Sequence, residues 1–399
     1  MTSTVYIAKN VYGGDGLGRL GDGRVVFVPG AWAGENVKAE IVEEKRHYVK
    51  ARLVEVVDPS PDRIDGGALA GVPGCVYATL SPKAEAEVKD AQLREFFERA
   101  RLVGDGSSLF VPAVEPASPL NYRNKVVYHF ERQKGAWAIG YRKEPSHEVV
   151  DVANDPLARP EINAKLAEIR KAVLTLLTTG PEAVRRDVAQ KGNVTIRWSA
   201  RTGVKWWIGD APKDVVIKED TCGKVFEVPA DGFYQVNPAV GESLVKAAVA
   251  EYLKGADEAG NVLDLYCGVG VFGLAMIAAA GADERARRLI GIESGRQAIE
   301  FAKRNAAAQG VEAKFFAEQV GRNLKSIRAG AHTTIVVDPP RGGMEPNVPA
   351  WLAASPAPRI LYVSCDPATL TRDLKTICRG YEIESVRRVT SERAARFGV

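Results

Sequence analysis

The chain is poor in the residues that build disulfides and metal sites. It has 399 residues but only five cysteines and four histidines. No two cysteines form a C-x-x-C pair, and the histidines at positions 47, 129, 147 and 332 have no metal-ligand spacing, so neither a disulfide framework nor a zinc site is indicated. Scattered cysteines are typical of a reducing compartment. We therefore expect no metal ligands.

Long apolar segments are also absent. The longest apolar run, Val271–Ala280, is too short to span a bilayer. The N-terminus lacks the charged-then-apolar pattern of a signal segment. These absences predict a cytoplasmic protein without membrane contact. The net formal charge of +4 permits a nucleic-acid partner without requiring one. The sequence carries no signal for oligomerisation, and a monomer is favoured.

The first 58 residues alternate short apolar runs with glycine-rich turns. A chain of this length exceeds one ordinary core, so two or three domains are expected. Several short strands at this spacing predict a small β-barrel for residues 1–58. Gly13–Gly16 and Gly21–Gly23 are expected to supply the positive φ of tight turns. Residues 45–50 mix cations with rings, which suits either single-stranded RNA or an exposed hairpin.

Residues 59–228 indicate a mixed α+β domain. A proline- and glycine-rich connection precedes a charged amphipathic helix at 83–101, which is a candidate to pack on the domain that follows. Strands are predicted at 122–130, 136–142, 194–198 and 204–208, and a helix at 161–177. Trp137, Trp198, Trp206 and Trp207 are assigned to the core rather than to base stacking.

From residue 229 to 399, strands alternate with helices, the pattern of a doubly wound parallel sheet. Asp264-Leu-Tyr-Cys-Gly-Val-Gly270 follows a strand and opens a helix. Gly268 and Gly270 let the backbone approach a ligand closely. Glu293 ends the next strand, where an acid can bind ribose hydroxyls, and Asp338-Pro-Pro-Arg341 ends a later one. Gly273 has the spacing of a nicotinamide fingerprint, so a dehydrogenase is an alternative.

Cys365 is the most informative single residue. It ends a predicted strand at 360–363 and precedes the turn Asp366-Pro367 and a helix. Open α/β sheets place their ligands at such strand ends. A nearby helix N-terminus would favour the thiolate. The competing interpretation is a buried, inert cysteine.

The motifs resemble those of a known enzyme family. Gly14-Asp15-Gly16-Leu17-Gly18 and Val26-Phe27-Val28-Pro29-Gly30 resemble a TRAM domain, an OB-like barrel attached to RNA-modifying enzymes. The three strand ends together resemble an S-adenosylmethionine methyltransferase. Gly232-Phe-Tyr-Gln-Val-Asn237 and Ser364-Cys-Asp-Pro-Ala-Thr-Leu-Thr-Arg-Asp373 resemble the RNA (uracil-5-)-methyltransferases.

The resemblance implies an OB-like barrel (1–58), a mixed α+β central domain (59–228) and a Rossmann-like methyltransferase domain (229–399). It also implies S-adenosyl-L-methionine as cofactor, contacted by Gln235, Tyr266, Glu293 and Asp338. The partner is RNA, with 23S ribosomal RNA favoured over transfer RNA because transfer-RNA members often lack the barrel. Cys365 is the implied nucleophile.

The implied reaction explains the need for a cysteine. Carbon 5 of uracil is a poor nucleophile, and a thiolate that adds to carbon 6 creates an enolate able to attack a methyl donor. A base then removes the proton at carbon 5. The target base must leave its stack. Arg341 and Arg372 are candidates to hold phosphate or to polarise the uracil carbonyl, and Arg372 equally suits a carboxylate on its own helix.

The chain departs from the family at two places. Many members bind an iron–sulfur cluster through four cysteines, three of them just after the TRAM domain. This chain has only Cys75 there, and one thiolate cannot hold a cluster that needs four, so no cluster is expected and Cys75 is assigned to a buried thiol.

The glutamate base of the family falls at about Gly398 or Val399, and Glu392 is the one nearby carboxylate. A protein that binds RNA and cofactor without turnover is therefore an alternative. Methylation of transfer-RNA uridine or of carbon 5 of RNA cytosine is a lesser one.

Overall fold

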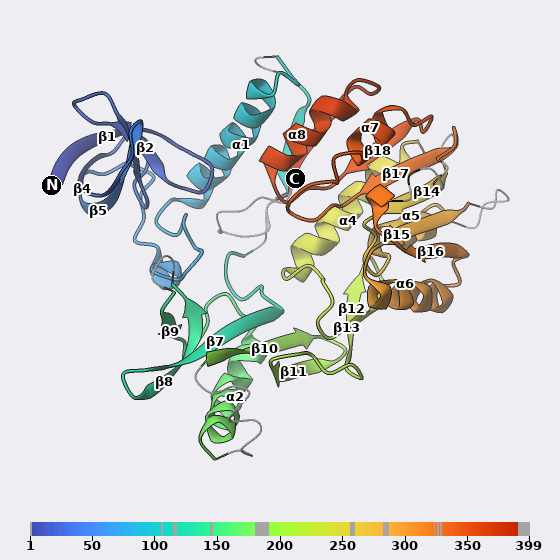
Figure 1. Cartoon of the computed structure of the whole chain (residues 1–399), viewed down its shortest axis with the longest axis horizontal. Coiled ribbons are helices and arrows are strands. Elements are labelled where there is room, and N and C mark those ends of the chain that lie inside the picture. Colours follow the sequence, from blue (N-terminus) through green and yellow to red (C-terminus); the bar gives the residue numbers. More distant parts are fainter. Residues whose placement is uncertain are drawn as a thin grey trace. The chain divides into compact units, whose positions relative to one another are not determined.

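The computed structural model describes residues 2–104, 107–114, 118–143, 147–179, 191–255, 260–281, 287–322, 324, 327 and 329–389 (Figure 1). The chain divides into two compact units, one running to Phe110 and one beginning at Val111. The domain boundaries at 58 and 228, and the packing of helix 83–101, stay predictions. Within the described ranges, no helix has both the length and the apolarity to cross a membrane.

The first unit contains the predicted barrel. Its strands pair in the closed order β1-β2-β3-β5-β4, and they are β1 (Thr2–Asn10), β2 (Gly16–Arg19), β3 (Val25–Val28), β4 (Asn36–Glu44) and β5 (Tyr48–Asp58). Alternate residues are buried, as a barrel wall requires, among them Val26 and Val28 at 0% exposure. The sequence-based prediction of a small barrel is confirmed.

One strand was missed where glycines were expected to form a turn. Gly13 and Gly14 do have positive φ, but Gly16 begins β2. A Cβ on Gly16 would lie 2.6 Å from the carbonyl oxygen of Ala31. Gly16 is therefore required for close backbone approach rather than for a turn.

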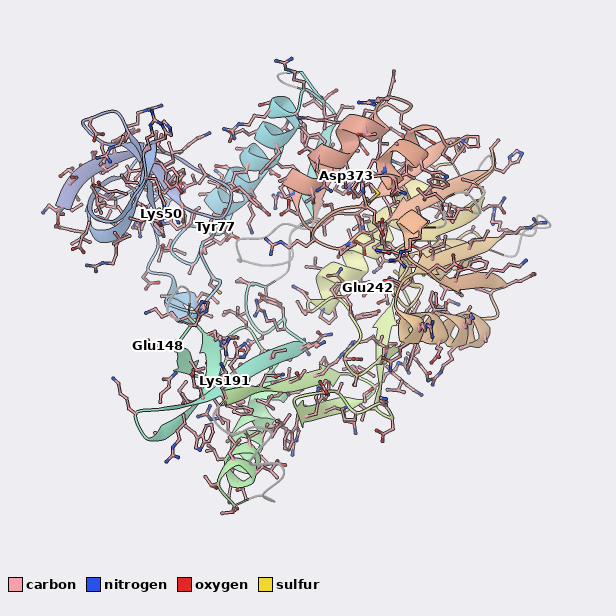
Figure 2. All side chains as sticks on the ribbon, viewed as in Figure 1. Lys50, Tyr77, Glu148, Lys191, Glu242 and Asp373 are labelled. Carbon is pink, nitrogen blue, oxygen red and sulfur yellow. The ribbon has the colours of Figure 1, made fainter. Side chains whose placement is uncertain are left out.

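A buried ion pair ties the barrel to the segment that follows it. Glu35 is fully buried and accepts from Nε of Arg63 at 2.6 Å and from Nη2 at 2.8 Å. It also accepts from the backbone N–H of Trp32 at 2.8 Å and of Ser60 at 3.2 Å. The same unit continues through the short 3₁₀ helix Gly67–Leu69 to α1 (Pro82–Arg99), with Tyr77 between them (Figure 2).

The second unit begins with an antiparallel sheet of order β11-β10-β7-β8-β9 packed on one helix. Its elements are β7 (Lys125–Gln133), β8 (Ala136–Arg142), β9 (Val149–Asp151), α2 (Pro160–Thr179), β10 (Lys191–Ser199) and β11 (Gly203–Ile208). Trp207 is 7% exposed, and Trp137, Trp198 and Trp206 pack against this core. The assignment of the four tryptophans to the core is confirmed.

A hairpin that the sequence pattern did not reveal follows this sheet. It pairs β12 (Val216–Thr221) with β13 (Lys224–Pro229). Phe226 of the hairpin is fully buried in the core of the parallel sheet. The hairpin therefore links the antiparallel half of this unit to the parallel half.

The parallel half is the predicted doubly wound sheet. Its five strands have the order β16-β15-β14-β17-β18, so the direction of winding reverses between β14 and β17. The strands are β14 (Asn261–Leu265), β15 (Leu289–Glu293), β16 (Ala313–Ala317), β17 (Thr333–Val337) and β18 (Arg359–Tyr362). Such a reversal is where open α/β sheets bind ligands.

Helices connect and cover these strands (Figure 1). They are α4 (Pro238–Leu253), α5 (Val271–Ala279), α6 (Arg296–Gln309), the 3₁₀ turn Val320–Arg322, α7 (Val348–Ala353) and α8 (Pro367–Ile377). A two-stranded sheet pairs β6 (Phe110–Val114) with β19 (Val386–Val389).

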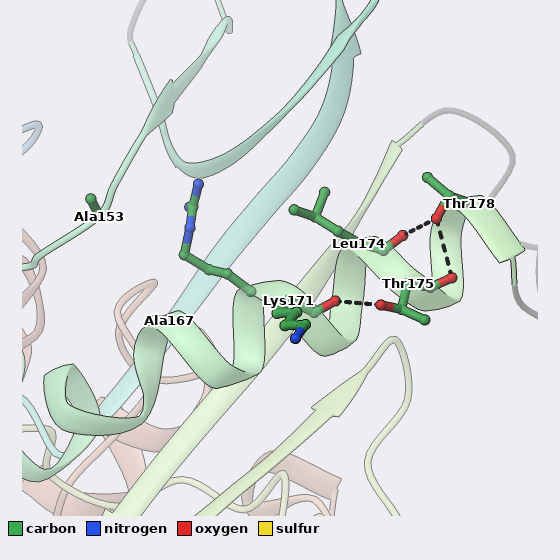
Figure 3. Close-up of a pocket in the computed structure, with 7 residues that line it drawn as sticks. Ala153, Ala167, Lys171, Leu174, Thr175 and Thr178 are labelled. Carbon is green, nitrogen blue, oxygen red and sulfur yellow. Dashed lines mark hydrogen bonds between the residues drawn. The ribbon is translucent and has the colours of Figure 1, made fainter.

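A depression of about 440 Å³ lies along α2 (Figure 3). The hydroxyls of Thr175 and Thr178 donate to carbonyls of their own helix, and Arg170 is paired with Asp151. These polar groups are thus satisfied within the protein, and the depression belongs to the antiparallel half rather than to the strand ends where ligands are expected.

The ion pair of the barrel gives a stability prediction. Arg63→Ala leaves the buried Glu35 carboxylate without its counter-charge, which should cost about 3 kcal/mol. Hydrogen exchange of peptides from residues 30–64 in the full chain should accelerate about 100-fold. Arg52→Ala, which removes the partner of Glu40 in an exposed pair on the same barrel, should cost less than about 1 kcal/mol.

The difference in stability between Arg63→Ala and Arg52→Ala should depend on pH. Burial raises the pKa of Glu35, but Arg63 and the two N–H donors outweigh burial and hold it below its usual value. The stabilisation is therefore present above the unfolded-state pKa of about 4.3 and is lost as the pH falls through the lower folded-state pKa. Equal exchange in Arg63→Ala and Arg52→Ala would contradict this account.

Candidate active site

Four neighbouring strands end in register at one edge of the parallel sheet. Leu265 lies opposite Ile292 and Val337, and Val337 lies opposite Tyr362. Backbone hydrogen bonds continue past these ends, including one from the N–H of Asp338 to the carbonyl of Leu265 at 3.3 Å. The residues that directly follow the four strands therefore share one edge of the sheet.

The turn after β14 is open to a ligand. Tyr266, Gly268 and Gly270 all have positive φ, at 63°, 54° and 87°. A Cβ built on Gly268 meets no atom within 4 Å, and Gly270 begins α5 without a side-chain cap. The backbone at Gly268 thus leaves room for close approach of a ligand group, beside the N-terminus of the nine-residue helix α5.

Tyr266 is held by its hydroxyl. The phenol donates to the Glu345 carboxylate, and burial with this contact raises the pKa of Tyr266 above its ordinary range. A bulky residue with positive φ is uncommon and marks a locally constrained backbone. The contact fixes the ring at the mouth of the glycine turn, next to the predicted cofactor position.

A buried carboxylate lies behind the turn. One oxygen of Asp264 accepts from the N–H of Gly273 at 2.9 Å, and the other has no partner among the described residues. Burial, opposed by the Gly273 contact and assisted by the carboxylates of Asp338 and Glu293, raises the pKa of Asp264 to about 7. Carboxyl groups therefore gather at this edge, and the described residues give Asp264 no ion-pair partner.

Glu293 and Asp338 present unused oxygens to this edge. Oε1 of Glu293 accepts from Oγ of Ser294 at 2.9 Å and from the N–H of Gly295 at 2.8 Å, while Oε2 has no donor among the described residues. The carboxylate of Asp338 likewise accepts no hydrogen bond from them, and burial raises its pKa to about 7. Glu293 thus caps the next turn and still has an oxygen for a ligand.

Cys365 is exposed, which contradicts the interpretation as an inert buried cysteine. The expected stabilisation of its thiolate is wrong, however. Desolvation of the thiol raises its pKa, Asp338 adds to the effect, and Arg341 opposes it. The physical reason is that the surroundings of the thiol desolvate it and the charges of Asp338 and Asp366 disfavour the thiolate. Asp366 also caps α8, accepting from the N–H groups of Ala368 at 2.9 Å and Thr369 at 3.0 Å.

The two candidate arginines differ in availability. Arg372 donates from Nε to Asp373 at 2.8 Å and from Nη2 to the carbonyl of Gly342 at 3.2 Å, so it serves a carboxylate on its own helix α8 (Figure 2). Arg341 is 45% exposed, and its nearest carboxylate, Asp366, lies at 3.9 Å. Of the two, Arg341 is the one free to meet substrate.

Gln235 lies on the segment between β13 and α4, where Phe233 is exposed and the next three residues are half-buried. Tyr234 is anchored inside by a hydrogen bond between its hydroxyl and that of Thr221. Its neighbour Phe233 is 75% exposed. Gln235 is half-buried, and its aliphatic part packs against α4. A Cβ added to Gly241 of that helix would lie 2.7 Å from the Gln235 Cβ. The sequence motif contained Phe233, but its exposure could not be seen there.

Asn305 of α6 is a further site residue that sequence reasoning missed. It is 1% exposed, and its Nδ2 donates to the carbonyls of Val269 and Glu227, both at 3.0 Å. Its Oδ1 accepts from the N–H of Glu227 at 2.7 Å. The side chain ties the glycine turn to β13, and a polar residue on the buried stripe of α6 was the available signal.

No three histidine, cysteine, aspartate or glutamate side chains within the described ranges could together hold a metal ion. Cys75 is buried at 8% exposure, as assigned. The absence of an iron–sulfur cluster stays a prediction. Glu392 and positions 398 and 399, discussed as sites of the base, lie outside the described residues.

Comparisons with known proteins match both units. The profile of the tRNA (Uracil-5-)-methyltransferase family matches residues 215–389, and that of the TRAM domain matches residues 2–54. An uncharacterized RNA methyltransferase of Gloeobacter violaceus is 29% identical over 95% of this chain and 91% of its own length. The 23S rRNA (uracil(1939)-C(5))-methyltransferase RlmD of Methylococcus capsulatus is 28% identical over 94% of this chain and 90% of its own length.

A solved structure has the same fold. It is the Pyrococcus abyssi tRNA (uracil-54, C5)-methyltransferase in complex with S-adenosyl-L-homocysteine, with 21% identity and a TM-score of 0.73. The similarity covers 99% of this chain and 98% of that one. The predicted combination of a barrel with a Rossmann-like domain is confirmed by this match.

The electrostatics of Cys365 can be tested by alkylation. Asp338→Asn removes a charge that raises the pKa of the thiol, so the thiolate fraction at pH 8 should rise and iodoacetamide should react about threefold faster or more. Arg341→Gln should have the opposite effect, since Arg341 lowers that pKa. Mass spectrometry of the peptide that contains Cys365 measures both rates, and a slower reaction in Asp338→Asn would contradict the assignment.

Proposed function

We propose that this chain, which is similar to RNA (uracil-5-)-methyltransferases, methylates carbon 5 of a uridine in ribosomal RNA through a covalent adduct of Cys365. The observation that carries the proposal is an exposed thiol at the strand edge that also holds an open glycine turn and unpaired carboxylates. This edge combines a nucleophile with a place for a methyl donor.

The residues at the edge fit S-adenosyl-L-methionine, whose sulfonium supplies an electrophilic methyl group when bound. Oε2 of Glu293 is available to accept from ribose hydroxyls. The gathered charge of Asp264, Glu293 and Asp338 favours a ligand that carries positive charge. The backbone at Gly268 and Gly270, together with Tyr266 and Gln235, completes the proposed cofactor site. The orphaned oxygen of Asp264 supports this fit, because buried polar atoms are rarely left unpaired.

The thiol must lose its proton before it can attack carbon 6. Asp338 interacts electrostatically with Cys365 and has a pKa of about 7. Asp366 also lies nearby, but its carboxylate is occupied by the cap of α8. We therefore assign Asp338 as the acceptor of the thiol proton. The thiolate would then bond to carbon 6, and carbon 5 would take the methyl group from the sulfonium, which leaves as a thioether. Transfer of the carbon 5 proton to a base would then expel the cysteine as a thiolate.

The target uridine must leave its stack to reach the thiol. Phe233 offers an exposed ring beside the proposed cofactor residue Gln235, and aromatic faces bind unstacked bases of any sequence. Arg341 is exposed and free to meet a phosphate or the uracil carbonyl. These two side chains are our candidates for holding the substrate.

Ribosomal RNA is the favoured substrate. The relative named as a 23S rRNA enzyme is 28% identical to this chain, and the structural relative named as a tRNA enzyme is 21% identical. Both align over nearly the whole chain, so the barrel alone does not separate the two substrates. The alternative of RNA and cofactor binding without turnover remains distinct, because such a protein would form the adduct and not release it.

The nucleophile is tested by substitution. Cys365→Ser should reduce transfer of labelled methyl to uracil carbon 5 by on the order of 10³-fold or more, because a serine hydroxyl is a far weaker nucleophile. RNA that contains 5-fluorouridine should trap wild type as an adduct stable to denaturant, since fluorine at carbon 5 cannot leave as a proton does. Cys378→Ser, at the end of α8, is the matched control and should retain activity.

Each outcome separates the hypotheses. Methylated product in multiple turnovers supports an enzyme, whereas one adduct per chain without release supports the binding protein. Label at carbon 5 of cytosine, or undiminished transfer by Cys365→Ser, would contradict the proposal.

The proposed contact of Gln235 with the cofactor can be tested by a substitution at Gly241, which lies against it. Gly241→Ala places a methyl group 2.7 Å from the Gln235 Cβ, so the glutamine must shift although alanine favours the helix. We expect S-adenosylhomocysteine to bind about tenfold more weakly, equivalent to ~1.4 kcal/mol, by calorimetry. Ser243→Ala on the same helix should leave the dissociation constant unchanged. If Gly241→Ala binds S-adenosylhomocysteine as tightly as the wild type, Gln235 is not part of the cofactor site.

A further inference from the structure

The segment that carries Phe233 and Gln235 is held from the opposite half of the unit by one buried guanidinium. Arg197 lies on β10 of the antiparallel sheet and is 1% exposed. Its Nη1 donates to three backbone carbonyls, those of Pro229 at 3.3 Å, Ala230 at 3.2 Å and Gly232 at 3.0 Å. Three carbonyls in four consecutive residues thus converge on one nitrogen, directly before Phe233.

The charge of Arg197 is balanced inside the protein. Nη2 donates to Oε1 of Glu219 on β12 at 3.3 Å, and Glu219 is 4% exposed. Burial raises the pKa of Glu219, and Arg197 opposes that shift. Nε of Arg197 is buried and has no partner among the described residues. Burying an arginine costs desolvation free energy, and an unpaired donor adds to that cost. Arg197 is therefore a poor source of stability, and a functional role is the better explanation for it.

Asn124 fixes the other end of the same segment. Its backbone N–H donates to the carbonyl of Val236 at 2.9 Å, and its side-chain amide donates to Oε1 of Glu219 at 3.3 Å. Arg197 and Asn124 therefore share one carboxylate and hold the backbone on both sides of Phe233, Tyr234 and Gln235. Phe233 and Gln235, the side chains with proposed ligand contacts, therefore lie between two points at which the backbone is hydrogen-bonded.

We propose that Arg197, balanced by Glu219, is a positioning residue that sets the backbone of residues 229–236 so that Gln235 meets the cofactor and Phe233 meets the target base. This inference rests on the proposed function of those two side chains. Arg197 touches neither ligand itself. Lysine cannot reproduce its effect, because a single ammonium lacks the planar fork that reaches carbonyls and a carboxylate together.

The chain contains a matched control pair. Arg201 donates to both oxygens of Asp220, at 2.8 and 2.9 Å, and the two side chains are 50% and 45% exposed. This pair joins the turn after β10 to β12, as Arg197 joins β10 itself to β12, but its hydrogen bonds do not reach residues 229–236. Arg201→Lys changes the same chemistry at a neighbouring place without touching the segment.

The experiment is a double-mutant cycle on the full chain. Arg197→Lys should weaken S-adenosylhomocysteine binding tenfold or more and raise the KM for RNA, while Arg201→Lys should change neither. Gln235→Ala combined with Arg197→Lys should bind no more weakly than the weaker of the two single variants, because both remove the same contact. The alkylation rate of Cys365, which lies on another element, should be unchanged in Arg197→Lys.

A merely structural arginine would give different results. It would lower the thermal midpoint of Arg197→Lys while leaving affinity unchanged well below that midpoint, or its effect would add fully to that of Gln235→Ala; either result overturns the inference. If Arg197→Lys does not fold, Glu219→Gln replaces it in the double-mutant cycle, and the expected outcomes are the same. A wild-type chain that binds no S-adenosylhomocysteine would overturn the proposed function instead.

Discussion

Burial of carboxylates at one sheet edge is the constraint on which the proposed site depends. Parallel pairing of β14 with β15 and β17 brings Asp264, Glu293 and Asp338 to one edge, and burial raises the pKa of both aspartates to about 7. An edge of this kind is stable only when its charge is reduced by protons or by a cationic ligand. A sulfonium cofactor, bound as proposed, would supply such a positive charge.

The proposed nucleophile follows a strand of the same sheet, and its pKa is raised in the free protein. Cys365 follows the strand next to β17, and Asp338 both raises the pKa of its thiol and offers an acceptor for its proton. A thiol that stays protonated in the free protein is protected from oxidation and from unproductive metal binding. It becomes a nucleophile where a proton acceptor and an electrophilic uracil are present together.

Local chemistry made much of this site predictable. The strand ends at Glu293 and Val337, and the turn after Leu265, follow from apolar runs that stop at acids and glycines. The order of the sheet and the closed barrel agree with the predicted fold. The raised pKa of the Cys365 thiol was not visible in the sequence, because its leading causes are desolvation and Asp338, which follows another strand.

Residues whose partners lie far along the chain were not predictable in this way. Arg197 reaches carbonyls 32 to 35 positions away, and Asn305 bonds to Glu227 across 78 positions. The β12–β13 hairpin was missed because Val-Ile-Lys-Glu-Asp-Thr alternates weakly and is buried mainly by elements of the other half. Periodicity reports which face of an element is buried but does not identify the surface that buries it.

The central claim is that this chain methylates carbon 5 of a ribosomal uridine. Mass mapping of modified nucleosides in RNA from cells with and without the gene tests it most directly. The account predicts that one 5-methyluridine in 23S ribosomal RNA disappears with the gene and returns with the wild-type chain but not with Cys365→Ser. An unchanged 5-methyluridine map, or loss of the modification from transfer RNA alone, would contradict it.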